Sequence, residues 1–162
     1  MASLLFPQKD SRFIQTQTGL ILDSYARWFH RTLYPVQGSA SDQAFQLFEA
    51  PFILLSSNTD SDPLLNYGNQ KCLELWELTW EELRKTPGRL TAEPDEQTKR
   101  AAFLKEVREN GFIQNYEGIR ISKTGKRFYI KNVAVWNLLD TAGNYAGQAA
   151  MFTEWIKVER RK

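Results

Sequence analysis

Residues 112–153 constrain the fold of this chain most, because they form three runs rich in aromatic and β-branched residues. The breaks between the runs, Lys123–Lys126 and Thr141–Asn144, each contain a glycine. This pattern is typical of three antiparallel strands joined by short hairpins. Segments 132–139 and 145–153 carry no charged side chain, whereas a sheet with one wet face alternates apolar and polar residues. We therefore expect both faces of the sheet to be covered.

The composition indicates one globular domain without a special chemical class. The chain has 162 residues, with 21 basic and 19 acidic side chains, and such a balance gives no support for nucleic-acid binding. Its single cysteine, Cys72, excludes an internal disulfide and a cysteine-rich zinc site, and we expect no metal. The N-terminal apolar run ends at Pro7, so this run is too short for a signal peptide. No run reaches the ~20 apolar residues of a membrane span. We expect a cytoplasmic protein that binds neither nucleic acid nor membrane.

An amphipathic helix is predicted near the N-terminus, after a loose polar arm over residues 1–18. The predicted helix spans residues 19–35, and Pro35 ends it. Its apolar stripe is the candidate surface for capping the sheet or for forming a homodimer, and the two roles are compatible. The stripe consists of Ile21, Tyr25, Trp28, Phe29 and Leu33.

The middle of the chain alternates short strands and short helices. Asp42 is predicted to cap a helix that ends at Glu49, before Pro51. Strands are expected at 52–56 and 64–67, and a small helix at 70–77.

Capping signals define the remaining helices. Thr79 and Glu82 have the spacing of a capping box, and Pro94 suits the first position of a helix that Gly111 ends. Residues 157–162 are predicted to form a basic tail. Two strands, a group of small helices and three strands predict an α+β fold, a five-stranded antiparallel sheet with helices on one face.

Six short motifs occur in the order found in the MEKHLA domain, and the chain resembles that family over about residues 20–153. MEKHLA is PAS-related and occurs as small bacterial proteins and at the C-terminus of plant class III homeodomain–leucine zipper factors. The resemblance implies a PAS-like domain over residues 42–156 with a sensory or interaction role, and no settled ligand. The homeodomain and zipper have no counterpart here, so it implies nothing about DNA binding. The motifs are Phe48–Phe52, Asn66–Asn69, Trp80–Leu83, Arg89–Glu93, Trp136–Asp140 and Gly147–Ala150.

Cofactors known from PAS domains lack their usual ligands in this sequence. Haem in this fold takes an axial histidine from the helix before the third strand, and residues 95–110 contain none. Flavin photosensors of this fold place a reactive cysteine in a segment that corresponds to 87–93, which has none. Cys72 is better explained as a small buried residue. We expect no cofactor, while non-covalent flavin binding stays open.

Catalytic motifs are equally scarce. The only histidine is His30, and the sequence contains no nucleophile elbow for which it could act as the general base. Gly125 and Lys126 resemble a phosphate loop, but Arg127 stands where Ser or Thr is required. No catalytic residue is assigned, and an enzyme that polarises a substrate with Tyr116 or Arg120 is the least favoured alternative.

The cavity between the sheet and the small helices is the expected ligand site of a PAS-like fold. A period of two in the fourth strand predicts that Asn132 and Trp136 point inward and that Val133 and Val135 point outward. One bulge would exchange these faces and replace Asn132 by Asn137. The structural alternatives are a core hydrogen bond for Asn132 and salt bridges for the arginines. The candidate ligand-binding residues are Arg89, Tyr116, Arg120, Asn132, Trp136 and Gln148.

The preferred functional hypothesis is a non-enzymatic, PAS-like sensory or interaction domain. It would bind a small molecule, a protein partner or both, and signal through dimerisation or through that partner. The main alternative is a protein-interaction module with a filled core and no ligand. A well-formed cavity would separate the two hypotheses.

Overall fold

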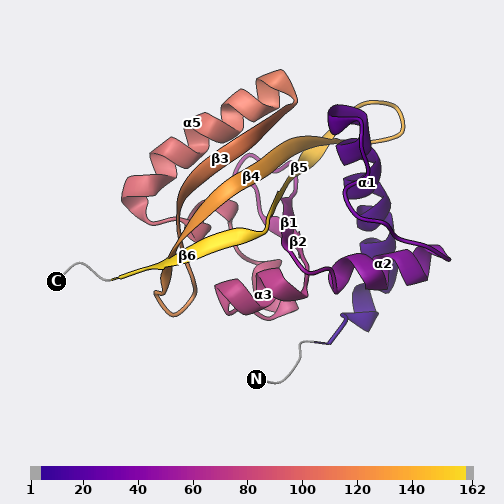
Figure 1. Ribbon diagram of the computed structural model, residues 1–162, viewed down its shortest axis with the longest axis horizontal. Helices are drawn as coiled ribbons and strands as arrows, with labels where there is room; N and C mark the ends of the chain where they lie inside the picture. Colours follow the sequence, from indigo (N-terminus) through magenta and orange to yellow (C-terminus); the bar gives the residue numbers. More distant parts are fainter. Residues whose placement is uncertain (1–4, 160–162) are drawn as a thin grey trace.

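A single antiparallel sheet forms the centre of the protein. The computed structural model describes residues 5–159 of the chain. The strand order is β2-β1-β5-β4-β3, and β6 continues the line of β5 along the same neighbour, β4 (Figure 1). This is the predicted five-stranded antiparallel sheet, with its last strand interrupted at Thr153. The strands are β1 (Ile53–Ser57), β2 (Leu65–Gly68), β3 (Phe112–Ile121), β4 (Arg127–Leu139), β5 (Tyr145–Phe152) and β6 (Glu154–Val158).

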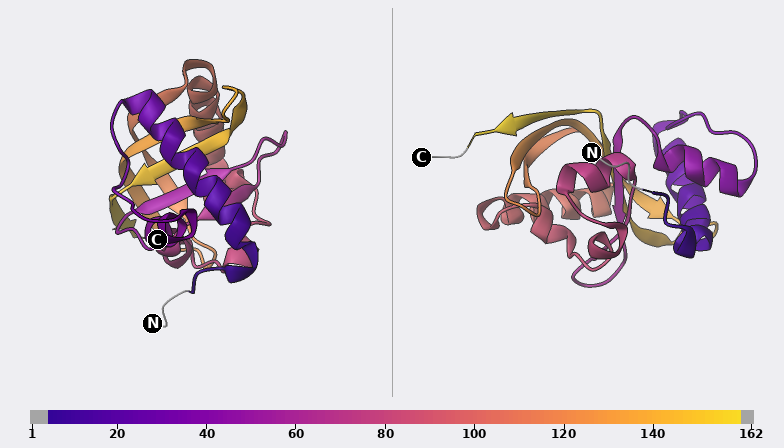
Figure 2. Two further views of the ribbon diagram at one scale, coloured as in Figure 1. Left: turned by 90° about the vertical axis from the view of Figure 1, so that its right-hand side faces the viewer. Right: turned by 90° about the horizontal axis from the view of Figure 1, so that it is seen from below.

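Helices cover both faces of this sheet, as its uncharged strands predict. Helix α1 crosses one face with α2 beside it, whereas α5 lies along β3 on the opposite face, together with α3 (Figures 1 and 2). No helix within residues 5–159 has both the length and the apolar composition to cross a bilayer. The helices are η1 (Gln8–Asp10), α1 (Ser11–Phe29), α2 (Ala40–Phe48), α3 (Gln70–Trp76), α4 (Trp80–Leu83), η2 (Gly88–Thr91) and α5 (Pro94–Asn110).

The capping signals read from the sequence are mostly confirmed. Thr79 and Glu82 form the predicted capping box of α4, and α5 begins at Pro94. Helix α5 ends at Gly111, whose φ of 100° is a conformation that glycine adopts without strain. The predicted cap of α2 is wrong by three residues, because Ser39 is the N-cap and Asp42 is its reciprocal partner.

Helix α1 corrects the prediction of a loose arm over residues 1–18. The helix begins at Ser11 and ends at His30, whose φ is 55°, so Pro35 does not end it. Its first turns were missed because polar side chains occupy buried positions there. Gln17 is buried and donates from Nε2 to the Ser56 hydroxyl at 2.9 Å, so no apolar period marks this part of the helix. Residues 1–4 of the predicted arm lie outside the described residues.

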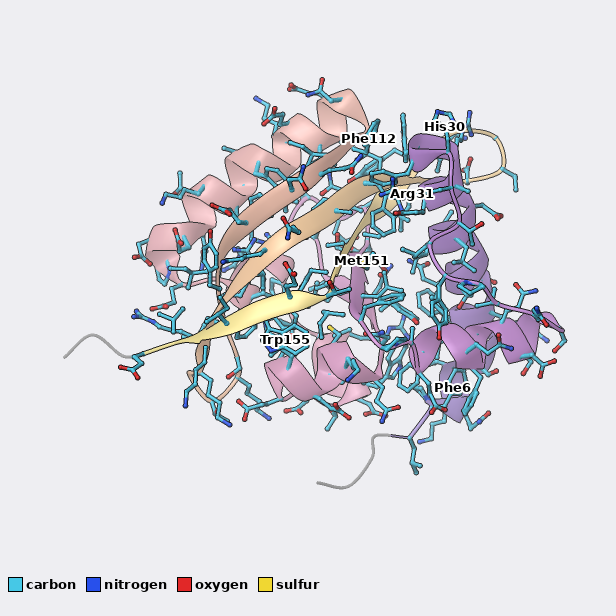
Figure 3. All side chains as sticks on the ribbon, in the orientation of Figure 1. Phe6, His30, Arg31, Phe112, Met151 and Trp155 are labelled. Atoms are coloured by element: carbon cyan, nitrogen blue, oxygen red, sulfur yellow. The ribbon has the colours of Figure 1, made fainter. Side chains whose placement is uncertain are left out.

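Aromatic rings join α1 to the sheet. Tyr25 and Phe29 lie edge-on against Trp136, with ring centroids 5.0 and 6.0 Å away. Phe112, at the start of β3, points to the same end of α1, near His30 (Figure 3), and its ring centroid is 4.9 Å from that of Phe29. This contact fixes α1 on the sheet of its own chain.

A bulge in β4 exchanges the faces that the sequence predicted for its second half. The φ of Asn132 is 53°, and the β3–β4 register shifts between Tyr116 and Gly118. Beyond the bulge, Val133 and Val135 face α5, whereas Trp136 faces α1. The predicted inward direction of Asn132 and Trp136 is therefore wrong, because one extra residue reverses the period of two.

The C-terminal segment corrects a further prediction. Residues 154–158 form β6 and pair with residues 127–131 of β4, so Lys157 and Val158 belong to the sheet and not to a basic tail. Residues 160–162 of that predicted tail lie outside the described residues. Trp155 and Ile156 are the exposed large apolar side chains of this strand.

Candidate functional site

A small, partly open cavity lies between the sheet and α5, at the position expected for a ligand in this fold. Its volume is about 60 Å³, the space of a few water molecules at roughly 15–30 Å³ each. Most of its walls are aliphatic or aromatic, and the polar exceptions come from η2, α5 and β3. The lining residues are Leu55, Trp76, Thr91, Arg100, Phe103, Leu104, Tyr116, Arg120, Ile130, Val133, Val135, Ala150 and Phe152.

Arg120 and Tyr116 form the polar edge contributed by β3. Arg120 is only 6% exposed, and its guanidinium donates to the Tyr116 phenolic oxygen at 2.9 Å and to the Ile119 carbonyl at 2.8 Å. Tyr116 stacks on Phe103 of α5 with ring centroids 3.6 Å apart. These contacts hold the Arg120 charge at the cavity wall while leaving it without a carboxylate partner.

Arg100 of α5 brings a second positive charge to the same cavity. Within residues 5–159 it makes no hydrogen bond and no ion pair. Burial, followed by the nearby positive charge of Arg120, lowers the pKa of Arg100 to about 10. Gly88 allows this placement, because a Cβ there would lie 2.7 Å from a terminal nitrogen of Arg100. The Arg100 side chain therefore remains a cation at neutral pH, in an environment that disfavours the charge.

Trp76 adds an unpaired hydrogen-bond donor to the cavity lining. Its side chain is buried and packs edge-on against Phe128, with ring centroids 5.0 Å apart. The indole Nε1 has no hydrogen-bond partner. A buried polar group of this kind normally has a partner, but three other buried polar atoms of the described residues, among them the Trp136 indole nitrogen, are unpaired as well, so this donor alone does not indicate a ligand.

Asn137 and Gln148 connect the rim of the cavity to the other face of the sheet. Gln148 donates to the carbonyl of Leu104, a lining residue, at 3.0 Å and to the Asn137 side-chain oxygen at 3.2 Å. The Asn137 amide group donates to the Arg108 carbonyl at 3.1 Å. Asn137 of β4 thus contacts both α5 and β5. In the sequence analysis it was only the alternative to Asn132, for the case that a bulge exchanges the faces of the strand.

The structure brings two of the six predicted ligand residues together at the cavity. Tyr116 and Arg120 line it, whereas Gln148 contacts only the backbone carbonyl of a lining residue, Leu104. Arg89 lies elsewhere, in an exposed ion pair with Asp62 at 3.2 Å.

The other two predicted residues are placed elsewhere by the bulge. Asn132 is exposed and donates to Glu154 at 2.7 Å. Trp136 is fully buried on the face covered by α1. The sequence missed Arg100 and Trp76, because residues on two different helices reveal a common cavity only once both helices are packed on the sheet.

The predicted interface residues of α1 lie against the sheet of their own chain. Ile21, Tyr25 and Phe29 are buried there, and Trp28 donates its indole N–H to the Asn137 carbonyl at 2.9 Å. The stripe therefore caps the sheet within one chain.

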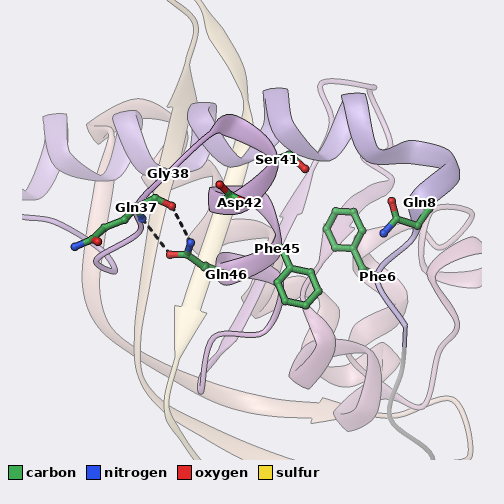
Figure 4. Close-up of a pocket in the computed structure, with 8 residues that line it drawn as sticks. All are labelled: Phe6, Gln8, Gln37, Gly38, Ser41, Asp42, Phe45 and Gln46. Atoms are coloured by element: carbon green, nitrogen blue, oxygen red, sulfur yellow. Dashed lines mark hydrogen bonds between the residues drawn. The ribbon is translucent and has the colours of Figure 1, made fainter.

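A second hollow lies on the surface between the N-terminal segment and α2 (Figure 4). Phe6 and Phe45 form its apolar part, with ring centroids 6.0 Å apart. Its amide groups satisfy each other, since Gln46 accepts from the Gln37 backbone N–H at 3.0 Å and donates to the Gln37 carbonyl at 2.8 Å. Its one charged lining residue, Asp42, is engaged by the Ser39 backbone N–H in the capping box of α2, so the cavity between the sheet and α5 is the stronger candidate.

A flavin or a haem does not match the size of the cavity between the sheet and α5. Sites for ligands of drug size measure about 300–1,000 Å³, and the stacked Phe103 and Tyr116 rings occupy the space beside α5. Cys72 does not line the cavity, and burial raises the pKa of its thiol. The described residues contain no group of three or more His, Cys, Asp or Glu side chains arranged to hold a metal ion.

Comparison with known proteins agrees with the fold described above. The family model of the MEKHLA domain matches residues 15–157. No curated protein matches the sequence.

Solved structures of the same fold include a light-oxygen-voltage domain studied with a flavin analogue. It has 19% identity and a TM-score of 0.57, over 75% of this chain and 86% of that one. The PAS domain of a protein from Colwellia psychrerythraea has 12% identity and a TM-score of 0.59, over 74% and 96%. An RNA-binding light-oxygen-voltage receptor has 13% identity and a TM-score of 0.58, over 70% and 32%. At these identities the likeness shows a PAS-like fold.

Proposed function

Because the chain belongs to the MEKHLA domain family and has a PAS-like fold, we propose that it is a ligand-sensing module without catalytic activity. The ligand binds in the cavity between the sheet and α5. The observation that carries this proposal is the pair of arginines, Arg100 and Arg120, at a cavity in the apolar core. Charged side chains are rarely buried without a partner, so a core built only for packing gains nothing from them.

The composition of the cavity favours binding over catalysis. Its titratable lining residues are Arg100, Tyr116 and Arg120, and among the described residues no carboxylate, histidine or cysteine lines it. General acid–base chemistry needs a group that exchanges a proton near the working pH, and a covalent mechanism needs an activated nucleophile. The lining residues offer neither, whereas they are suited to holding a ligand.

A chain of hydrogen bonds gives bound ligand a route to the opposite face of the sheet. It runs from the Leu104 carbonyl through Gln148 to Asn137, and from the Asn137 carbonyl to Trp28 of α1. We propose that a ligand which shifts α5 changes, through these contacts, how α1 packs on the sheet. The output surface then lies on the α1 side, where a protein partner or a second copy can read it.

A cavity-blocking substitution tests the proposal. The Ala150→Leu substitution places a larger side chain at a lining position of β5, whereas Ala101→Leu makes the same change at an exposed position of α5. A thermal-shift screen of charged and neutral small metabolites is run on both variants and on the unmodified protein. We expect one chemical class to raise the melting temperature of the unmodified protein and of Ala101→Leu. The same compounds should not change the melting temperature of Ala150→Leu from its value without compound.

Two outcomes would contradict ligand sensing in this cavity. One is a screen in which no compound shifts the unmodified protein. The other is a compound that stabilises Ala150→Leu as much as the unmodified protein. The first outcome favours the alternative, an interaction module with a filled core, for which the small volume of about 60 Å³ is the supporting observation.

A further inference from the structure

The polar groups at the cavity are matched to an acceptor with negative charge. Arg100 and Arg120 are cations, and both line the cavity with the unpaired indole N–H of Trp76. No residue lining the described cavity carries a negative charge at neutral pH. The site therefore offers donors and positive charge, and it lacks a counter-charge of its own.

Three arginines that lie nearer the surface have acidic partners, unlike Arg100 and Arg120. Arg127 pairs with Glu93, Arg84 with Asp10 at 3.3 Å and Arg89 with Asp62 at 3.2 Å. These three pairs lie nearer the surface, where leaving a charge unpaired costs little. Among residues 5–159, Arg120 is the most buried arginine and has no acidic partner, although burial is the condition under which a partner matters most.

The shape of the site limits the anion. A guanidinium binds a carboxylate through two parallel hydrogen bonds, and this geometry favours planar oxyanions. The opposite walls, which include Val133, Val135 and Phe152, offer only apolar contacts, so they suit a hydrocarbon tail. A volume of about 60 Å³ leaves room for a short tail only.

We propose that the cavity binds a short-chain monocarboxylate, of the size of formate or acetate, between Arg100 and Arg120, with the indole N–H of Trp76 as a further donor. This inference rests on the proposed function, because it names the class of ligand for the same cavity. The carboxylate supplies the counter-charge that the chain lacks, and its tail faces the apolar strands. Binding brings the Arg100 side chain toward β3 and so couples α5 to the sheet.

The test compares acetate with acetamide, which has nearly the same shape and no charge. Melting temperatures are measured with sodium acetate, sodium formate or acetamide, while sodium chloride holds the ionic strength constant. At about ten times its Kd, acetate should raise the melting temperature by roughly 3–6 °C. Acetamide should have no such effect.

Two matched variants assign the effect to the cavity. Arg100→Gln removes the cavity charge, whereas Lys99→Gln removes the neighbouring, exposed charge of the same helix. We expect Lys99→Gln to keep the full acetate shift and Arg100→Gln to lose most of it. Without acetate, Arg100→Gln should melt no lower than the unmodified protein, because it relieves the repulsion between two like charges.

The outcomes separate this inference from the proposed function. If acetamide stabilises as much as acetate, or if Arg100→Gln keeps the full acetate shift, the carboxylate assignment is overturned. The proposed function would survive either result if a neutral compound stabilises the unmodified protein and Ala101→Leu but not Ala150→Leu, in which the cavity is blocked. If no probe, charged or neutral, changes the melting temperature, both the assignment and the proposed function fail.

Discussion

The indole N–H of Trp28 in α1 donates to the backbone carbonyl of Asn137 in β4 at 2.9 Å, and this bond attaches α1 to a residue that also contacts α5. On the other face, the Asn137 side chain contacts the Arg108 carbonyl of α5 and the amide of Gln148. Asn137 also donates its backbone N–H to the Gly111 carbonyl at 2.8 Å. One residue of β4 therefore holds both large helices against the sheet.

Replacing Asn137 by alanine should destabilise the protein by about 2–3 kcal/mol. The change removes the side-chain bonds and leaves the Arg108 carbonyl and the Gln148 amide without their partner in a partly buried place. Urea titration followed by tryptophan fluorescence measures the loss. The control is Asn132→Gly, because Asn132 is exposed with a φ of 53° that glycine adopts freely. We expect that variant to stay within about 0.5 kcal/mol, and equal losses for both would contradict the bulge at Asn132.

Trp136→Ala should cost about 3–5 kcal/mol, the usual loss for a large aromatic core residue. Trp136 is fully buried and contacts the rings of Tyr25 and Phe29. Trp155→Ala is the control, because Trp155 is 38% exposed on β6, and its loss should be roughly 1 kcal/mol or less. Near-equal midpoints for the two variants in a urea titration would show that α1 does not seal this face.

Gly111→Ala should destabilise the protein more than Gly125→Ala does. Both glycines have positive φ, 100° and 90°, so alanine adds backbone strain of about 1–3 kcal/mol at either position. Only at Gly111 would the new methyl group meet another side chain, since it would lie 2.5 Å from the Trp28 ring. The difference between the two unfolding free energies isolates this contact, and a difference of zero would mean that Trp28 moves aside freely.

Glu77 should make stability depend on acid pH. Hydrogen bonds from Thr124 and Ser122, and then the Lys126 ammonium 3.0 Å away, lower the pKa of Glu77 from about 4.5 to about 2. A lowered pKa means that the contribution is fully present above about pH 4.5 and is lost as pH falls toward about 2.

The matching measurement is the melting temperature between about pH 5 and pH 2.5. We expect Glu77→Gln to lose less over that window than the unmodified protein. Glu81→Gln, which removes an exposed carboxylate of α4, should behave like the unmodified protein. If Glu77→Gln falls as steeply as Glu81→Gln does, the bonds to the β3–β4 turn contribute nothing.

Local signals explain which parts of the fold the sequence revealed. Pro94 and Gly111 bound α5, and the capping box of Thr79 and Glu82 places α4, because capping depends on neighbours a few residues away. The start of α1 was hidden because Gln17 and Thr18 are buried polar residues. Their burial depends on partners such as Ser56, which lies 39 positions away.

The candidate site was only partly visible in the sequence, for a geometric reason. Tyr116 and Arg120 lie before the bulge at Asn132 and were placed at the cavity, whereas Trp136 lies beyond it and was placed on the wrong face. A single residue with positive φ reverses the alternation. Arg100 was not predicted, because it is one of many charged residues on a polar helix and its approach to Gly88 is a tertiary contact.

The most direct test of the carboxylate site is the indole N–H region of a proton–nitrogen NMR spectrum during titration with sodium acetate. The chain has five tryptophans, and Trp76→Phe identifies the Trp76 signal. Trp136 is an internal control, because its indole nitrogen is also buried without a partner but lies on the α1 face. We predict that acetate moves the Trp76 signal downfield to saturation, that acetamide does not, and that Trp136 barely responds. An unmoved Trp76 signal, or equal movement of the Trp76 and Trp136 signals, would contradict a carboxylate bound between Arg100 and Arg120.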